Sequence, residues 1–186
     1  MNRLKFLQLE KDNVEHFELA KFVWQPFCHE INFHDGIKET DEEIIDALQK
    51  RISIQGTRPD MHFELALLNS EVIGIAMFAI DLGTVYGMLE KGYGTIMGFY
   101  IKPEYRRQSF GREMYQHIEN VLKNDGAPKI YLTPDGVTGE PFWTALGFEN
   151  SGKFDPDDKK FIYIKDVCKN AGVYSEIPVK EKDDIR

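Results

Sequence analysis

The segment from Thr95 to Arg112 holds the residues of this chain that are best suited to binding an anion. Ile96 to Ile101 predicts an apolar strand, and a short polar turn leads from it into a helix that begins near Phe110. Such a turn directs several backbone N–H groups and a helix start at one point, where phosphate groups bind readily. Three arginines add positive charge there: Arg106, Arg107 and Arg112. The turn predicts an anion site, although a basic helix start on a solvated loop explains it equally well.

Length and composition describe a single acidic domain. The 186 residues carry a net charge of −8, which argues against general nucleic-acid binding and is compatible with a cationic substrate. No segment approaches the ~20 apolar residues of a membrane span, and the N-terminus lacks a signal-peptide pattern, so we expect a cytoplasmic protein without a membrane partner. Cys28 and Cys168 predict two free thiols. We expect one domain over residues 1–166 and a C-terminal tail over 167–186.

Strand and helix signals alternate along the chain and predict a mixed sheet covered by helices. A first helix is expected from Val14, with Pro26 ending it and an irregular segment, residues 27–36, following. Thr40 to Glu43 forms a capping box that starts a second helix. The other predicted elements are strands at 5–9, 129–132 and 161–164, a hairpin over 62–68 and 72–80, a strand beginning at Phe148, and a short helix at 141–146.

A second motif, Pro141 to Phe148, follows the turn by about thirty residues. Together the two motifs resemble the GNAT superfamily of acyl-CoA-dependent N-acetyltransferases. Its long motif is a strand, a Gln/Arg-x-x-Gly-x-Gly/Ala turn and a helix, and Arg106-x-x-Ser109-x-Gly111 resembles that turn. The resemblance spans roughly residues 3 to 165. It implies a GNAT-like α/β (α+β) fold whose mixed, mostly antiparallel central sheet has six to seven strands flanked by helices.

The resemblance also implies acetyl-CoA as cofactor. The backbone of Phe99, Tyr100 and Ile101 would pair with the pantetheine arm as an added strand would. Phe142 and Trp143 would pack beside the thiol end. The N–H groups expected around the pyrophosphate belong to Arg106, Arg107, Gln108, Ser109, Phe110, Gly111 and Arg112.

Four positions depart from the family pattern. Arg107 and Ser109 stand where glycine is usual. Trp143 replaces a tyrosine that protonates the departing thiolate in many members, and an indole has no accessible acid function. Thr95 replaces a glutamate that serves as base in some members. Cofactor binding is therefore better supported than any catalytic side chain.

The candidate catalytic residues are Glu90 as base, directly or through water, and Tyr93 as acid, with water as an alternative proton donor. Asp81 and Glu64 are alternative bases, and Tyr100 and Tyr131 are alternative acids. Each carboxylate also has a structural interpretation: Glu90 as a loop charge, Asp81 as a strand-end cap, and Glu64 as an exposed strand position.

Substrate contacts are expected from His29, Glu30 and His34, and from Tyr86 in the glycine-rich loop. His29, Glu30, His34 and Asp35 also resemble a metal-ligand cluster, but their spacing fits no standard site, so we expect no metal.

The sequence thus predicts an enzyme that moves an acetyl group from acetyl-CoA to a primary amine of a small molecule or peptide by direct attack. The alternative is a non-catalytic acyl-CoA-binding or ligand-sensing domain. An unrelated phosphate-ligand enzyme ranks last because the chain has no Gly-Lys-Ser/Thr loop. Dimers are frequent in proteins that this fold resembles, so a homodimer is a further expectation.

Overall fold

The structure is a computed structural model that describes residues 3–83, 90–156 and 158–167. A mixed sheet runs through the molecule. Within these residues seven strands lie in the order β1-β2-β3-β4-β5-β7-β6. Only β4 and β5 are parallel among the neighbouring pairs; the others are antiparallel. The strands are β1 Leu4–Gln8, β2 Met61–Leu68, β3 Glu71–Ile80, β4 Gly94–Ile101, β5 Lys129–Leu132, β6 Glu149–Asp155 and β7 Lys160–Asp166. The predicted fold class is confirmed.

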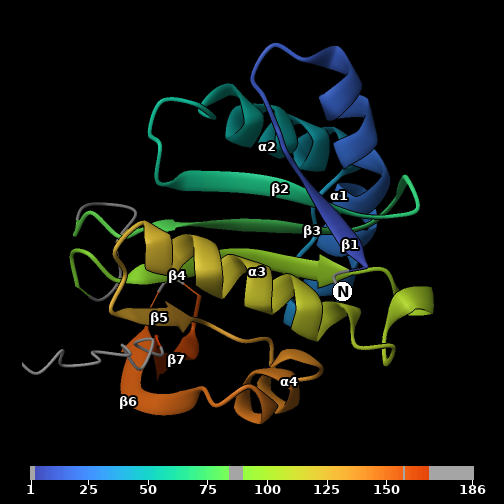
Figure 1. Ribbon diagram of the computed structural model, residues 1–186. Coiled ribbons are helices and arrows are strands. Elements are labelled where there is room, and N and C mark those ends of the chain that lie inside the picture. The colour runs from blue at the N-terminus through green and yellow to red at the C-terminus, as the bar shows by residue number, and fades with distance from the viewer. Residues whose placement is uncertain (1–2, 84–89, 157, 168–186) are drawn as a thin grey trace, which may run out of the picture.

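Helices cover both faces of the sheet (Figure 1). They are α1 Val14–Asp35, α2 Asp41–Ser53, α3 Phe110–Asn124 and α4 Gly139–Ala145, with a 3-10 turn, η1, at Pro103–Tyr105. One apolar cluster joins α1 and α2 to the sheet, with Trp24, Leu48 and Phe63 buried in it. The other joins α3 and α4 to the opposite face around Ile118 and Trp143. We call these the α1/α2 face and the α3 face.

β4 and β5 part after only two paired residues. Gly94 pairs with Ile130 and Thr95 with Tyr131, and no pairing follows between the two strands. The register between β3 and β4 shifts beside Met97, so that Met97 is the extra residue of a β-bulge. A bulge bends its strand, and here β4 turns away from β5. The two strands form a wedge that is closed at Thr95 and open toward Ile101.

The first helix is longer than the sequence predicted. The prediction that Pro26 ends it and that residues 27–36 are irregular is wrong, because α1 continues to Asp35 and is capped by Gly36 at φ 68°. Proline removes one helical hydrogen bond, the one to the carbonyl four residues earlier. Both Pro26 and Phe22, which carries that carbonyl, are exposed, so water can replace the lost donor. Packing of Trp24 and Phe27 on either side of the proline keeps the helix continuous.

Other local predictions are confirmed. The capping box at the start of α2 has both its hydrogen bonds, between Thr40 and Glu43. The hairpin of β2 and β3 turns through Asn69 and Ser70, both with positive φ, as a two-residue turn requires. The predicted tail lies outside the described residues except for Val167, which is buried and donates to the Pro128 carbonyl at 3.0 Å.

Candidate active site

The turn between β4 and α3 has the backbone of a glycine-rich loop without its glycines. Arg107 and Ser109 adopt φ values of 62° and 69°, a region that side chains disfavour and glycine accepts. These are the two positions where the resemblance places glycine. Ser109 is the residue before α3, but its side chain makes no capping hydrogen bond. The loop conformation is therefore kept at the expense of backbone strain, which points to a requirement for this shape.

The same turn presents a row of free backbone donors. The N–H groups of Arg107 through Arg112 have no hydrogen-bond partner among the described residues. The Arg106 N–H differs, since it donates to the Pro103 carbonyl at 3.1 Å. The first helical bond of α3 runs from the Glu113 N–H to the Ser109 carbonyl. Six consecutive donors at a helix start form a site for an anion with several oxygens, such as a diphosphate.

Arg106 is used inside the protein rather than at the anion site. Its Nη2 lies 2.7 Å from Glu30 Oε2 of α1, and its Nε donates to the Ile101 carbonyl at 2.8 Å. Burial lowers the pKa of Arg106, but hydrogen bonding and charge from Glu30 outweigh it and raise the pKa overall. The guanidinium thus ties α1 to the end of β4. It also lies over the Tyr100 ring, whose pKa is raised mainly by burial, so Tyr100 is a weak candidate acid.

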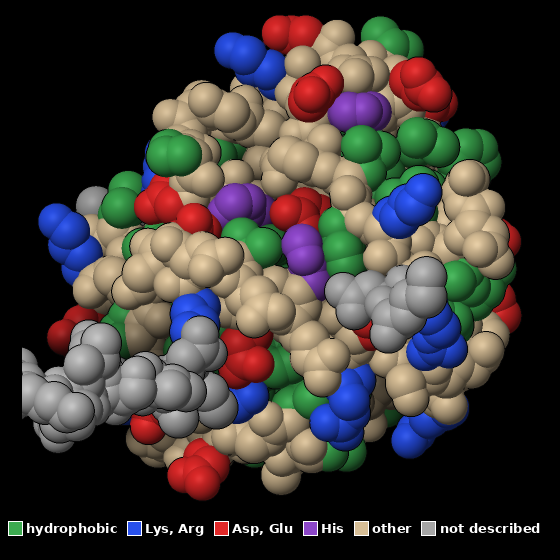
Figure 2. All heavy atoms as spheres, viewed as in Figure 1, with side chains coloured by type: hydrophobic (Ala, Val, Ile, Leu, Met, Phe, Trp, Pro, Cys, Tyr) green, Lys and Arg blue, Asp and Glu red, His purple; other side chains and the backbone are tan. Residues whose placement is uncertain are grey.

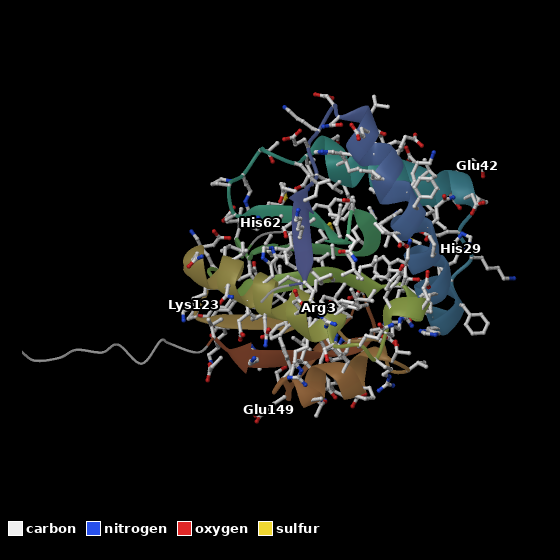
Figure 3. All side chains as sticks on the ribbon, turned by 45° about the vertical axis from the view of Figure 1, so that its right-hand side comes forward. Arg3, His29, Glu42, His62, Lys123 and Glu149 are labelled. Atoms are coloured by element: carbon white, nitrogen blue, oxygen red, sulfur yellow. The ribbon has the colours of Figure 1, made fainter. Side chains whose placement is uncertain are left out.

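Arg3 is a component of the turn that the sequence did not reveal (labelled in Figure 3). Its Nη2 donates to the Gln108 carbonyl at 2.7 Å, and its guanidinium lies 4.3 Å from the centre of the Phe110 ring. It also pairs with Glu113 at 3.5 Å. A contact across 105 residues leaves no signal in sequence spacing. Arg3 therefore braces the turn from the N-terminal end of β1, while its own charge is paired with Glu113.

Aromatic rings pack beside the helix start. A Cβ added to Gly111 would lie 3.2 Å from the Phe142 ring, so this glycine allows α4 to approach α3. Phe99 of β4 contacts the rings of Phe142 and Trp143 at 5.4 and 4.9 Å between centroids. Trp143 is only 5% exposed and Phe142 is half-buried. Of the two aromatic residues predicted near the thiol, Phe142 is therefore the more accessible.

A small cavity of about 170 Å³ opens on the α1/α2 face. Its wall includes Met97, the bulge residue of β4, and a Cβ on the neighbouring Gly98 would lie 3.6 Å from Phe27 of α1. Burial raises the pKa of the Cys28 thiol to about 12, so Cys28 is a poor nucleophile. The lining residues are Trp24, Phe27, Cys28, Ile31, Asn32, Arg51, Met77 and Met97. This cavity adjoins the strand that lines one side of the wedge.

Three buried polar residues lie at the closed end of the wedge. Tyr131 donates its hydroxyl to Asp81 Oδ2 at 2.7 Å, and the two residues are 0% and 2% exposed. Asp81 also accepts from the Gly83 N–H at 2.6 Å, as the predicted strand-end cap. Thr95 is the cross-strand partner of Tyr131, and its buried Oγ1 has no hydrogen-bond partner among the described residues. A polar group thus occupies the position where the family's glutamate would stand.

The other catalytic candidates are not part of this side-chain group, although Tyr93 lies next to Asp81, whose N–H donates to the Tyr93 carbonyl at 2.7 Å. Glu90 is exposed, and its carboxylate accepts from Tyr93, which raises the pKa of that phenol. Glu64 is not an exposed strand residue: it is 8% exposed and lies 2.6 Å from His117 Nε2. Glu64 faces α3 from β2, with β3 between β2 and β4, so it does not reach the wedge.

The predicted substrate residues His29, Glu30 and His34, which were expected in an irregular segment, lie on α1 and are separated from one another. His29 pairs with Asp41 of α2 at 2.9 Å and is exposed. Glu30 is held by Arg106, as described above. His34 lies 3.5 Å from Asp135 in the loop before α4, so the end of α1 reaches the β5 side of the wedge. Tyr86 lies outside the described residues. Among the described residues, no cluster of His, Cys, Asp or Glu is placed to hold a metal.

A larger cavity, about 680 Å³, lies elsewhere. It is lined mainly by residues 8–11 and 55–64, and it adjoins a group that we call the histidine–carboxylate cluster: His62, Glu64, His117 and Asp125. Figure 2 shows histidine and acidic side chains gathered on this side of the molecule. In Figure 3, His62 on β2 lies far from His29 on α1. Size alone would select this cavity, but it has neither the free turn donors nor the open strand edge.

A comparison with protein families identifies the class of the protein. The model of the acetyltransferase (GNAT) family matches residues 19–148, more than half of the chain. The chain therefore belongs to the GNAT acetyltransferases, enzymes whose cosubstrate is acetyl-CoA. None of the curated protein sequences compared with this chain matches it. No helix among the described residues is long and apolar enough to cross a membrane.

Solved structures share the fold. The PaiA N-acetyltransferase from Thermoplasma acidophilum, crystallised with coenzyme A, is 18% identical over 88% of this chain and 98% of its own, with a TM-score of 0.64. An acetyltransferase from Thermus thermophilus is also 18% identical, over 89% and 99%, with a TM-score of 0.67. The aminoglycoside N-acetyltransferase AAC(6')-Iy, bound to a bisubstrate analogue, is 15% identical over 82% and 95%, with a TM-score of 0.60. At these identities the likeness concerns the fold.

Proposed function

We propose that this protein transfers the acetyl group of acetyl-CoA to a primary amine by direct attack of the amine nitrogen. The observation that carries the proposal is the row of N–H groups from Arg107 to Arg112 at the open end of the wedge between β4 and β5, which have no partner in the part of the chain that the structure describes. These groups fit a diphosphate, and the wedge leaves an unpaired strand edge beside it for the pantetheine arm.

The geometry supports two specific strand contacts. Lys102 donates its N–H to the Ile73 carbonyl of β3. Since alternate residues of an antiparallel strand address opposite edges, the N–H and carbonyl of Phe99 and the N–H of Ile101 point into the wedge, whereas the polar groups of Tyr100 face β3. The Ile101 carbonyl already accepts from Arg106 Nε. The pantetheine arm would pair with Phe99 and Ile101 and run from the turn toward the closed end. Its thioester would then lie near the Met97 bulge, with the acceptor amine entering from the cavity on the α1/α2 face.

Acetyl-CoA supplies an activated acyl group: the new C–N bond forms as the C–S bond breaks, and the thiolate takes up a proton. The chain must hold the two reactants in line and accept a proton from the ammonium group. We assign that proton to Asp81, through Tyr131, with Thr95 Oγ1 orienting the nitrogen or an intervening water. The hydroxyl of Tyr131 already donates to Asp81, so one proton can enter at Tyr131 as another passes to the carboxylate. Glu90 and Tyr93 remain an untested alternative pair.

Two measurements test the function. Calorimetric titration should show binding of coenzyme A with one site per chain. Incubation of the protein with acetyl-CoA and a panel of primary amines should release free thiol and give an N-acetylated product. Tight CoA binding without thiol release across the panel would support the sensing alternative instead. Absence of CoA binding would contradict both.

The remaining proposals concern the domain bounds, the oligomeric state and the cellular location of the protein. We propose that the catalytic domain spans residues 1–166 and that 167–186 form a tail. A homodimer and a cytoplasmic location stay predictions, which sedimentation and fractionation would test.

A further inference from the structure

Arg51 is the charged residue among those that line the cavity on the α1/α2 face. It stands in the last turn of α2, where a cation is favourable. One of its N–H groups donates to the Ala47 carbonyl at 3.2 Å, and its guanidinium lies 5.0 Å from the centre of the Trp24 ring. Among the described residues, no carboxylate forms an ion pair with Arg51. Most of its donors are therefore left to a ligand or to solvent.

The surroundings of Arg51 favour a ligand. The rest of the cavity wall is largely apolar, with Trp24, Met77 and Met97 among its residues. The polar neighbour Asn32 already donates to Glu39 at 2.9 Å, and Cys28 carries no charge because burial raises its pKa to about 12. Glu39 is exposed, on the loop before α2. A half-buried guanidinium against an aromatic ring binds oxyanions strongly and with defined geometry.

We infer that the acceptor is a small amine with an oxyanion, and that Arg51 binds this oxyanion. The inference rests on the proposed function, which places the acceptor nitrogen near Met97. The nitrogen would face β4, the apolar part of the molecule would lie against Trp24 and Met77, and the oxyanion would reach Arg51. The small volume, about 170 Å³, suits an amino acid or a short amino acid derivative. This class is distinct from the cationic substrate that the net charge of the chain allows.

Pairs of acceptor amines with the same shape, one with and one without an oxyanion, show whether the enzyme recognises the negative charge of its substrate. α- and ω-amino acids should be acetylated with a kcat/KM about 10- to 100-fold above that of their carboxamides. O-phosphoethanolamine compared with ethanolamine tests whether the oxyanion is a phosphate instead. The Arg51→Met variant should lose the preference, mainly through KM, and Arg51→Lys should retain part of it. The Lys50→Met variant is the control, because it removes a cation from the same helical turn at a side chain that is 75% exposed.

Failure of the oxyanion inference can be distinguished from failure of the proposed acetyltransferase function. Equal use of carboxylates and carboxamides, or a preference for polyamines that Arg51→Met leaves unchanged, overturns the inference while the acetyltransferase proposal stands. If no amine is acetylated, the proposed function fails, and calorimetry of amino acid binding to the CoA-loaded protein still tests Arg51. Binding that Arg51→Met weakens at least tenfold, with unchanged CoA affinity, supports the oxyanion site, and unchanged binding refutes it.

Discussion

The turn after β4 and the histidine–carboxylate cluster are both rich in polar groups, but they differ in what those groups already bind. In the cluster, Glu64 lies 2.6 Å from His117, and His62 lies 2.8 Å from Asp125. Stacking of Phe6 on His117 at 3.8 Å covers the cluster further. In the turn, the N–H groups from Arg107 to Arg112 have no partner among the described residues. The titratable groups of the cluster thus already bind one another, whereas the backbone donors of the turn are left for the ligand that we propose.

The turn and the histidine–carboxylate cluster also differ in backbone strain. Arg107 and Ser109 hold left-handed conformations in the turn, which cost free energy that the fold must supply elsewhere. The contacts within the cluster join β2 to α3 and its C-terminal end. If this comparison is right, substitutions in the turn change cofactor binding, and substitutions in the cluster change stability.

The largest effect is expected from Gly111→Asp. The new carboxylate would stand at the helix start, against the diphosphate, and its Cβ would press on the Phe142 ring 3.2 Å away. We expect coenzyme A affinity to fall about 100-fold or more, roughly 3 kcal/mol, in a calorimetric titration. Gly111→Ala is the control for crowding alone and should cost much less. Unchanged affinity in Gly111→Asp would remove the turn from the site.

Substitutions that remove the proposed proton acceptor should have an effect nearly as large as that of Gly111→Asp. Tyr131→Phe and Asp81→Asn should each lower kcat about 100-fold while the affinity for coenzyme A stays the same. The double variant should be little worse than either single one, because the two groups act together. Tyr93→Phe is the matched control, and it should have little effect. A reversed pattern would return the catalytic role to Glu90 and Tyr93.

A smaller effect on binding is expected at Ser109, where φ is 69°. Ser109→Val places a β-branched residue in a conformation that it strongly disfavours, and we expect coenzyme A affinity about tenfold weaker. Ser109→Gly should bind at least as well as the original protein. Equal affinities for the two variants would show that the strained turn is not what the cofactor recognises.

The cluster should respond in stability alone. Glu64→Gln replaces a carboxylate that is 8% exposed and bonded to His117. We expect a loss of about 1–3 kcal/mol in the free energy of unfolding, measured by urea denaturation, with kcat and KM unchanged. A fall in kcat without a loss of stability would contradict the structural role.

The smallest effect concerns Cys28. With a thiol pKa of about 12, its thiolate fraction at pH 8 is about one in ten thousand. In a Cys168→Ser background, alkylation by iodoacetamide should therefore be far slower than that of free cysteine, and its rate should rise as the pH increases toward 12. Rapid alkylation at pH 8 would mean that the cavity is more polar than its lining indicates.

Local patterns in the sequence predicted much of this molecule. The capping box at Thr40 and the hairpin turn at Asn69 depend on neighbouring residues, and both are confirmed. Pro26 misled the prediction because whether a helix tolerates proline depends on whether the lost hydrogen bond faces solvent, which only the packing of α1 decides. The fold class followed from the order of elements and from the family resemblance.

The structure of the candidate site was predicted in part, and its function stays a proposal. The turn lies between the strand and the helix where the sequence predicted it. The contacts of its side chains were not predicted, since Arg106 pairs with Glu30, and Arg3 donates to the Gln108 carbonyl across 105 residues. The bond between Asp81 and Tyr131 spans 50 residues and depends on the register of β3, β4 and β5. Contacts of this kind have no spacing that a single sequence could reveal.

The most direct test is an NMR titration of the backbone amides with coenzyme A. The account predicts that the largest shifts occur at Arg107 to Arg112, with further changes at Phe99 and Ile101, whose N–H groups point into the wedge. It also predicts little change in residues 8–11 and 55–64, around the larger cavity. Shifts concentrated at the larger cavity, with the turn unaffected, would contradict the account.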